Sequence, residues 1–104
     1  MEELIEKLNI KVTELDVECL ITEKGTRAKG AFRWNYFTNQ AEILLSNSAN
    51  EKTKMHEIGH AINFILGKGY PISDTLKIDS EKFADIMADA IETLIKSAKQ
   101  EKED

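Results

Sequence analysis

The sequence is poor in cysteine and proline, and it has no long apolar run. Its 104 residues include one cysteine and one proline. The lone Cys19 cannot form an internal disulfide, which fits a reducing compartment. No stretch approaches the roughly 18 consecutive apolar residues of a membrane span, and the first residues lack the basic region and apolar run of a secretory signal. We therefore expect a cytoplasmic protein that does not bind a membrane.

Basic side chains are also in the minority. The chain has 14 Lys and Arg against 19 Asp and Glu, which gives a net charge of −5. Nucleic-acid binders normally present a basic face, so we expect no nucleic-acid partner. The length and the 41% hydrophobic content indicate one small domain with one core. The oligomeric state cannot be predicted from these features.

Hydrophobic periodicity predicts an α+β domain over residues 1–98 and a charged tail over residues 99–104, which we expect to fray. The expected order is an N-terminal helix, a small antiparallel β-sheet, and a central helix packed against a C-terminal helix. The predicted elements are a helix over 2–8, one or two strands within 10–21, a hairpin with arms at 32–36 and 41–45, a helix over 49–67, a loop over 67–79 and a last helix after it.

The two long helices have separate sequence signals. Ser48 followed by Glu51 matches a capping box, which predicts that the central helix begins near Ala49. The last helix is predicted from apolar residues at helical spacing. Its expected buried stripe consists of Phe83, Ile86, Met87, Ala90, Ile91, Leu94 and Ile95.

Both histidines of the chain fall in one motif, His56-Glu57-Ile58-Gly59-His60, inside the predicted central helix. Positions i and i+4 lie on one helix face, so the two imidazoles can converge on one Zn²⁺. Glu57 lies beside them and can act on a water molecule at the metal. We interpret H-E-x-x-H as a metal site, against the alternative of two surface histidines flanking a glutamate.

The third ligand must be a carboxylate or Cys19, because a catalytic zinc normally has three protein ligands and the chain has no third histidine. A lone cysteine in a strand is usually a small buried hydrophobe. We favour Glu81, which opens the last predicted helix, and keep Asp79 as the alternative. Asp85 follows Glu81 by four residues, so it can accept a hydrogen bond from a ligating histidine and orient the ring. The competing interpretation of these carboxylates is an ordinary solvated helix face.

The H-E-x-x-H motif and the segment from Glu81 to Ala88, EKFADIMA, resemble the zinc metallopeptidases of the ImmA/IrrE family, a minimal gluzincin arrangement. The family's second motif reads approximately E-x-x-A-x-x-F-A. Glu81, Ala84 and Ala88 match it, and Met87 stands where the family has an aromatic residue. The similarity in element order covers nearly the whole chain.

The resemblance implies zinc-dependent hydrolysis of peptide bonds in a protein or peptide substrate, including regulatory proteins. Zn²⁺ would be held by His56, His60 and Glu81, with Glu57 as the general base. Tyr70, Tyr36 and Arg33 remain equal candidates for stabilising the oxyanion. The alternative function is a non-enzymatic protein-interaction module stabilised by a metal, encoded by a phage or mobile element.

Overall fold

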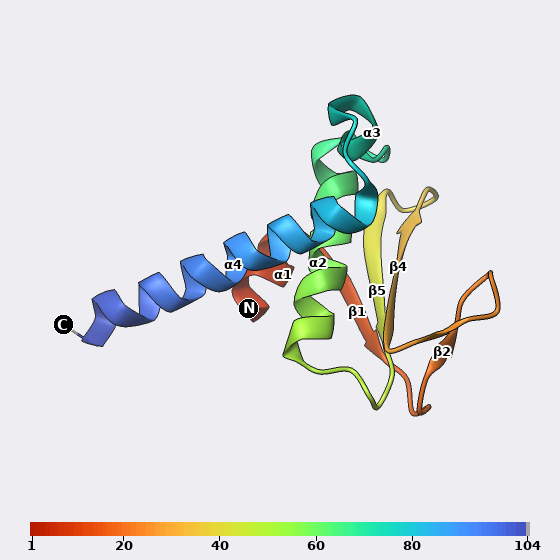
Figure 1. Cartoon of the computed structure of the whole chain (residues 1–104), viewed down its shortest axis with the longest axis horizontal. Coiled ribbons are helices and arrows are strands. Elements are labelled where there is room, and N and C mark those ends of the chain that lie inside the picture. Colours follow the sequence, from red (N-terminus) through yellow and green to blue (C-terminus); the bar gives the residue numbers. More distant parts are fainter. Residues whose placement is uncertain (104) are drawn as a thin grey trace.

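The computed structural model describes the backbone of residues 1–103 and the side chains of residues 1–98. It confirms the α+β class, with helices and a small sheet in the order shown in Figure 1. The elements are α1 (Glu2–Lys7), β1 (Lys11–Glu14), β2 (Leu20–Ile21), β3 (Arg27–Ala28), β4 (Gly30–Asn35), β5 (Gln40–Leu45), α2 (Glu51–Leu66), α3 (Ile72–Leu76) and α4 (Ser80–Glu103).

The main sheet has three strands in the order β1-β5-β4. β4 and β5 form the predicted antiparallel hairpin, with Phe32 opposite Ile43 and Trp34 opposite Ala41. β1 pairs with β5 in parallel, so the sheet is mixed and not wholly antiparallel. Because β4 takes one edge of β5, β1 can join only at the other edge. β2 and β3 form a separate two-stranded hairpin.

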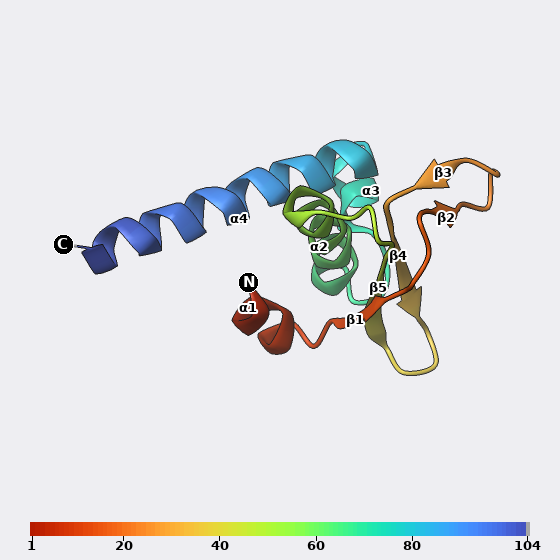
Figure 2. The ribbon, with the colours of Figure 1, turned by 90° about the horizontal axis from the view of Figure 1, so that it is seen from below.

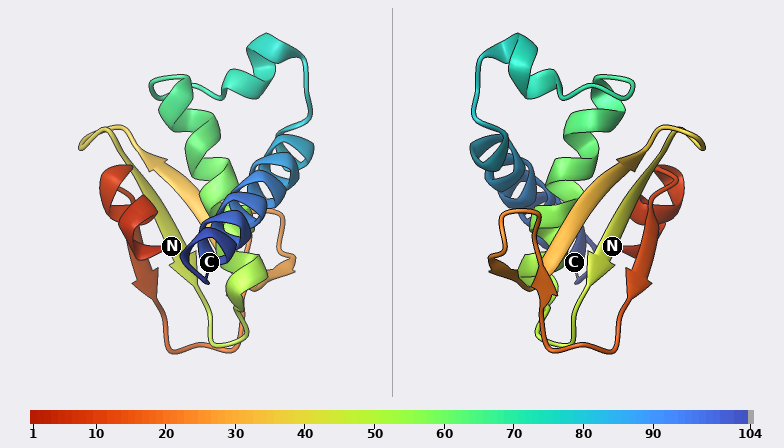
Figure 3. Two further views of the ribbon diagram at one scale, coloured as in Figure 1. Left: turned by 90° about the vertical axis from the view of Figure 1, so that its left-hand side faces the viewer. Right: turned by 90° about the vertical axis from the view of Figure 1, so that its right-hand side faces the viewer.

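The helices lie on one side of the main sheet (Figure 3). Side chains alternate between the faces of a strand, and Ala41, Ile43 and Leu45 of β5 form a buried core with Ile58 and Ala61 of α2. α4 crosses α2 and then continues away from the sheet (Figures 1 and 2). This arrangement places α2 against the sheet and brings the first turns of α4 next to it.

The start of α2 differs from the prediction. Its N-cap is Asn50, whose side chain accepts a hydrogen bond from the Thr53 N–H, and the Thr53 hydroxyl completes the capping box by accepting from the Asn50 N–H. The predicted box of Ser48 and Glu51 is therefore wrong. Ser48 is used elsewhere, because its hydroxyl donates to the backbone carbonyl of Glu18.

The predicted loop over 67–79 contains the short helix α3, which was not expected. Asn63 of α2 and Ser73 of α3, both fully buried, hold this helix in place. The Asn63 amide donates to the Ser73 hydroxyl at 2.9 Å, and its carbonyl accepts from the Ser73 N–H at 2.8 Å.

α4 buries a narrower face than its apolar pattern predicts. Phe83, Ala84 and Ile91 are buried, but Ile86 and Leu94 remain 45% and 69% exposed. Since α4 crosses α2 and extends past it, only one side of its first turns meets the body of the protein. The tail predicted over residues 99–104 lies outside the residues whose side chains are described and stays a prediction. Among the described residues, no helix is both long and apolar enough to cross a membrane.

Candidate metal centre

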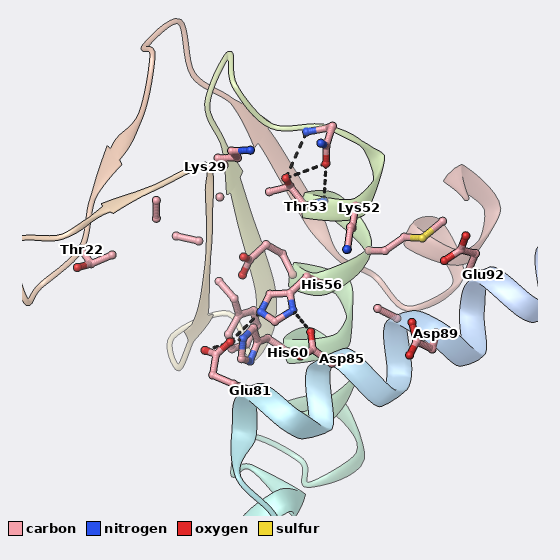
Figure 4. Close-up of a pocket in the computed structure, with 18 residues that line it drawn as sticks. Thr22, Lys29, Lys52, Thr53, His56, His60, Glu81, Asp85, Asp89 and Glu92 are labelled. Atoms are coloured by element: carbon pink, nitrogen blue, oxygen red, sulfur yellow. Dashed lines mark hydrogen bonds and ion pairs between the residues drawn. The ribbon is translucent and has the colours of Figure 1, made fainter.

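The crossing of α2 and α4 positions the candidate site. At the crossing, Gly59 of α2 lies so close to Ala84 of α4 that a Cβ atom on Gly59 would collide with the Ala84 backbone. A glycine opposite an alanine therefore sets a short distance between the helix axes. This contact brings Glu81 and Asp85, at the start of α4, to the two histidines of α2 (Figure 4).

His56 has an acidic partner at each ring nitrogen. Its Nε2 lies 2.8 Å from Oε2 of Glu81, and its Nδ1 lies 2.8 Å from Oδ1 of Asp85. Burial alone would lower the pKa of His56, but the hydrogen bonds to Asp85 and Glu81 outweigh burial and raise it. Asp85 thus occupies the orienting position that its spacing from Glu81 predicts.

His60 lies deeper, with 14% of its side chain exposed. Its Nε2 is 3.2 Å from Oε1 of Glu81, so the Glu81 carboxylate bridges the two imidazoles. Burial lowers the pKa of His60, and the nearby Glu81 charge only partly opposes this effect. Both rings therefore present Nε2 to the same carboxylate.

The three side chains form a donor set that suits a metal ion. One donor atom from each of His56, His60 and Glu81 lies within 4.8 Å of the others. Two imidazoles and a carboxylate are a common ligand set for zinc in catalytic sites, which keep the fourth position open. In Figure 4 these side chains converge from α2 and α4 on one point. The residues present therefore fit a divalent cation such as Zn²⁺.

Glu57 lies next to this donor set without a partner of its own. The residue is 7% exposed, and no hydrogen bond or ion pair to its carboxylate is found within residues 1–98. Burial raises the pKa of Glu57 to about 7, even though the His56 charge opposes the shift. Its Cγ atom packs close to Gly30 at the start of β4: a Cβ atom added to Gly30 would lie 3.2 Å from the Glu57 Cγ atom. The side chain is therefore a weakly acidic group that can exchange a proton near neutral pH.

A cleft of about 930 Å³ contains all of these groups. Its walls come from β3, β4, the first half of α2 and the first turns of α4. Asp89 and Glu92 continue the acidic side of α4 beyond Asp85, whereas Lys29 and Lys52 line other parts of the cleft (Figure 4). The donor set therefore lies in the wall of a cleft and not in the protein core.

Several candidates from the sequence lie elsewhere. Asp79 caps α4, because its carboxylate accepts hydrogen bonds from the N–H groups of Glu81 and Lys82 at 3.0 and 3.2 Å. Cys19 does not line the cleft. The structure therefore groups Glu81, and neither Asp79 nor Cys19, with the two histidines.

None of the three oxyanion candidates lines the cleft. Tyr36 and Tyr70 are 67% and 75% exposed outside it. The Arg33 guanidinium donates a hydrogen bond to Glu42 on the neighbouring strand. The donor side chains that do line the cleft, besides the histidines, are Thr22, Lys29, Asn50, Lys52 and Thr53.

Two residues that shape the site were not predicted from the sequence. Gly59 sets the helix crossing, and the ring of Phe32 stacks on His60 with their centroids 6.2 Å apart. A glycine in the middle of a predicted helix was an available signal. Glycine lowers helix stability, so its presence there indicates a close packing contact that no larger residue would allow. Phe32 gave no such signal, since an aromatic residue in a strand is ordinary.

Comparison with known proteins gives no relative: no family model, curated protein or solved structure matches the chain. The interpretation of the site therefore depends on its geometry and chemistry.

Proposed function

We propose that the chain is a zinc-dependent metallopeptidase of the ImmA/IrrE type. The observation that carries the proposal is the donor set of His56, His60 and Glu81 beside Glu57, a buried and unpaired carboxyl group with a pKa of about 7. Strongly shifted pKa values in a cleft are typical of catalytic groups. A structural metal site needs no such group.

Each residue has a defined role in this proposal. His56, His60 and Glu81 would hold the ion, and Asp85 fixes the His56 ring through its Nδ1 atom. A divalent ion held there would supply positive charge next to the scissile carbonyl and would lower the pKa of a bound water. Glu57 takes a proton from the attacking water and passes it to the leaving amine. In the metal-free protein burial favours the protonated form of Glu57, whereas the charge of a bound ion would favour the carboxylate that accepts a proton.

The substrate is proposed to be an extended segment of a protein or peptide. β4 is an edge strand of the described sheet, and its residues Ala31 and Phe32 line the cleft. An extended chain can add to such an edge through backbone hydrogen bonds, which would lay a peptide bond across the donor set. We propose the cytoplasm as the location, because the chain has only one cysteine.

The direct test is hydrolysis of a peptide library by the zinc-loaded protein, followed by mass spectrometry. We expect Glu57→Gln to lower the rate by about 10²- to 10⁴-fold, because general base catalysis is lost, while zinc content is unchanged. Glu42→Gln is the matched control, since it makes the same chemical change at a buried glutamate outside the cleft. Wild-type rates in Glu57→Gln would refute the proposed base.

The same experiment separates the alternative function. A metal-stabilised interaction module would bind zinc and hydrolyse none of the peptides. Calorimetry with a small hydroxamate gives a second criterion, because it needs an open coordination position at the ion. Binding would support the enzyme, and absence of binding by the zinc-loaded protein would support the module.

A further inference from the structure

The two histidines of the candidate metal centre are held in different ways. His56 has a hydrogen bond from each ring nitrogen to a carboxylate. His60 contacts Glu81 through Nε2, but among residues 1–98 no hydrogen-bond partner is found for its Nδ1. Metal-binding histidines almost always have such a partner, which fixes the rotation of the ring. Among the described residues, packing against neighbouring rings is the contact that can orient His60.

The ring of Phe32 provides that contact. Phe32 and His60 are stacked, with centroids 6.2 Å apart and planes inclined by only 16°. Phe32 also contacts Phe64, with ring centroids 5.0 Å apart, and Phe64 stacks on Trp34 with centroids 6.1 Å apart. The rings of His56 and His60 are nearly perpendicular, with centroids 4.8 Å apart and planes at 87°. His60 thus contacts both His56 and a row of aromatic rings that extends from β4 to α2.

We propose that Phe32 is a positioning residue of the candidate metal centre, whose flat ring fixes the rotation of the His60 imidazole in place of a hydrogen bond to Nδ1. The inference depends on the proposed donor set, because it concerns the direction in which Nε2 of His60 points. A branched aliphatic side chain would fill similar space but would present no flat face, so the imidazole could turn about its Cβ–Cγ bond. Ring stacking therefore has a role here beyond burial of apolar surface.

The test compares metal binding in Phe32→Leu and Phe64→Leu. Both variants replace one phenylalanine of the same aromatic row by leucine, but only Phe32 stacks on His60. Titration calorimetry with Zn²⁺ measures the affinity, and the visible absorption spectrum with Co²⁺ reports the geometry of the donors. Circular dichroism and thermal unfolding check that each variant is folded.

We expect Phe32→Leu to weaken Zn²⁺ binding by about 10-fold and to change the Co²⁺ spectrum, because loss of a residue that orients a ligand typically costs 10- to 100-fold in metal affinity. Asp85→Ala should show a similar loss, since it removes the orienting contact of His56. Phe64→Leu should keep the affinity and the spectrum of the wild type. Phe32→Tyr retains the ring and should have the affinity and the spectrum of the wild type. If Phe32→Leu does not fold, Phe32→Tyr serves as the test. Altered metal binding by Phe32→Tyr would then overturn the inference.

Equal effects of Phe32→Leu and Phe64→Leu would overturn the inference, because the role of Phe32 would then be ordinary packing. That failure differs from failure of the proposed function. If the wild type binds Zn²⁺ but cleaves no peptide, the peptidase proposal fails while the positioning role can still be measured. If the wild type binds neither Zn²⁺ nor Co²⁺, both proposals are wrong.

Discussion

Glu42 and Glu57 are both buried, with 5% and 7% of the residue exposed. Their environments nevertheless shift the pKa of the carboxyl group in opposite directions. Glu42 accepts hydrogen bonds from Arg33 and Asn35 of the neighbouring strand, and these bonds lower its pKa. Glu57 has no such partner, and burial raises its pKa to about 7. The two residues show that burial alone does not decide the charge of a carboxyl group.

The difference in pKa arises because the two glutamates lie in different places: Glu42 is on a strand of the sheet and Glu57 is on α2. Glu42 alternates with the core residues Ala41 and Ile43 on β5, so it points to the face away from α2, where Arg33 lies directly opposite in the register. Glu57 lies on α2 and faces the cleft. A paired carboxylate stabilises the fold, whereas an unpaired one next to a donor set is available for chemistry.

The largest expected effect concerns a third glutamate, Glu81. We expect Glu81→Gln to weaken Zn²⁺ binding by more than about 100-fold, because it removes a ligand, and removal of a residue that only orients a ligand already costs 10- to 100-fold. Calorimetry with Zn²⁺ measures the change. Glu57→Gln and Glu42→Gln are the controls and should bind Zn²⁺ like the wild type. Equal losses in all three variants would mean that the metal does not distinguish these glutamates.

An intermediate effect is expected for Glu57 in the stability of the metal-free protein. The unfolded chain loses this proton near pH 4.5, whereas the folded protein keeps it up to about pH 7. Because the folded state binds more protons in this window, the free energy of unfolding falls as pH rises from 4.5 to 7 and then stays low. Glu57→Gln should therefore be more stable than the wild type at pH 8, by on the order of 2 kcal/mol after allowance for solvent screening.

Urea unfolding at pH 4 and pH 8 in the presence of a chelator measures this difference. At pH 4 the carboxyl group is protonated in both states, so the gain seen at pH 8 should disappear. A variant that is less stable than the wild type at pH 8 would show that the Glu57 carboxylate has a stabilising partner, and its contrast with Glu42 would not hold.

The smallest effect on stability is expected for Glu42. Replacing Glu42 by glutamine should lower the free energy of unfolding, whereas replacing Glu57 should raise it. Since the folded-state pKa is lowered, Glu42 stabilises the protein above about pH 4.5, and this contribution is lost as pH falls through the folded-state pKa. Glu42→Gln should be less stable than the wild type at pH 7, and the two should converge in acid. Urea unfolding across this range provides the measurement, with the exposed Glu14→Gln on β1 as control. No convergence in acid would mean that the loss comes from packing and not from charge.

Local sequence patterns were enough to predict the helix that carries His56 and His60, because the motif spacing and the apolar period act over a few residues. The spacing of Glu81 and Asp85 likewise depends on one helix. In contrast, the capping role of Asn50, the parallel pairing of β1 and the stacking of Phe32 on His60 depend on which distant segments meet. The exposed face of α4 also depends on distant segments. The apolar period of a helix does not show how much of its length is covered by a neighbouring helix.

The two hydrogen bonds between Asn63 and Ser73 have a consequence for how a metal would bind. An ion that joins His60 to Glu81 closes a loop through residues 61–80, and closing a free loop of this kind costs conformational entropy. Two hydrogen bonds in a fully buried setting already restrain that loop through α3. Folding, and not the ion, thus restricts this connection, so the proposed ligands would be preorganised before a metal binds.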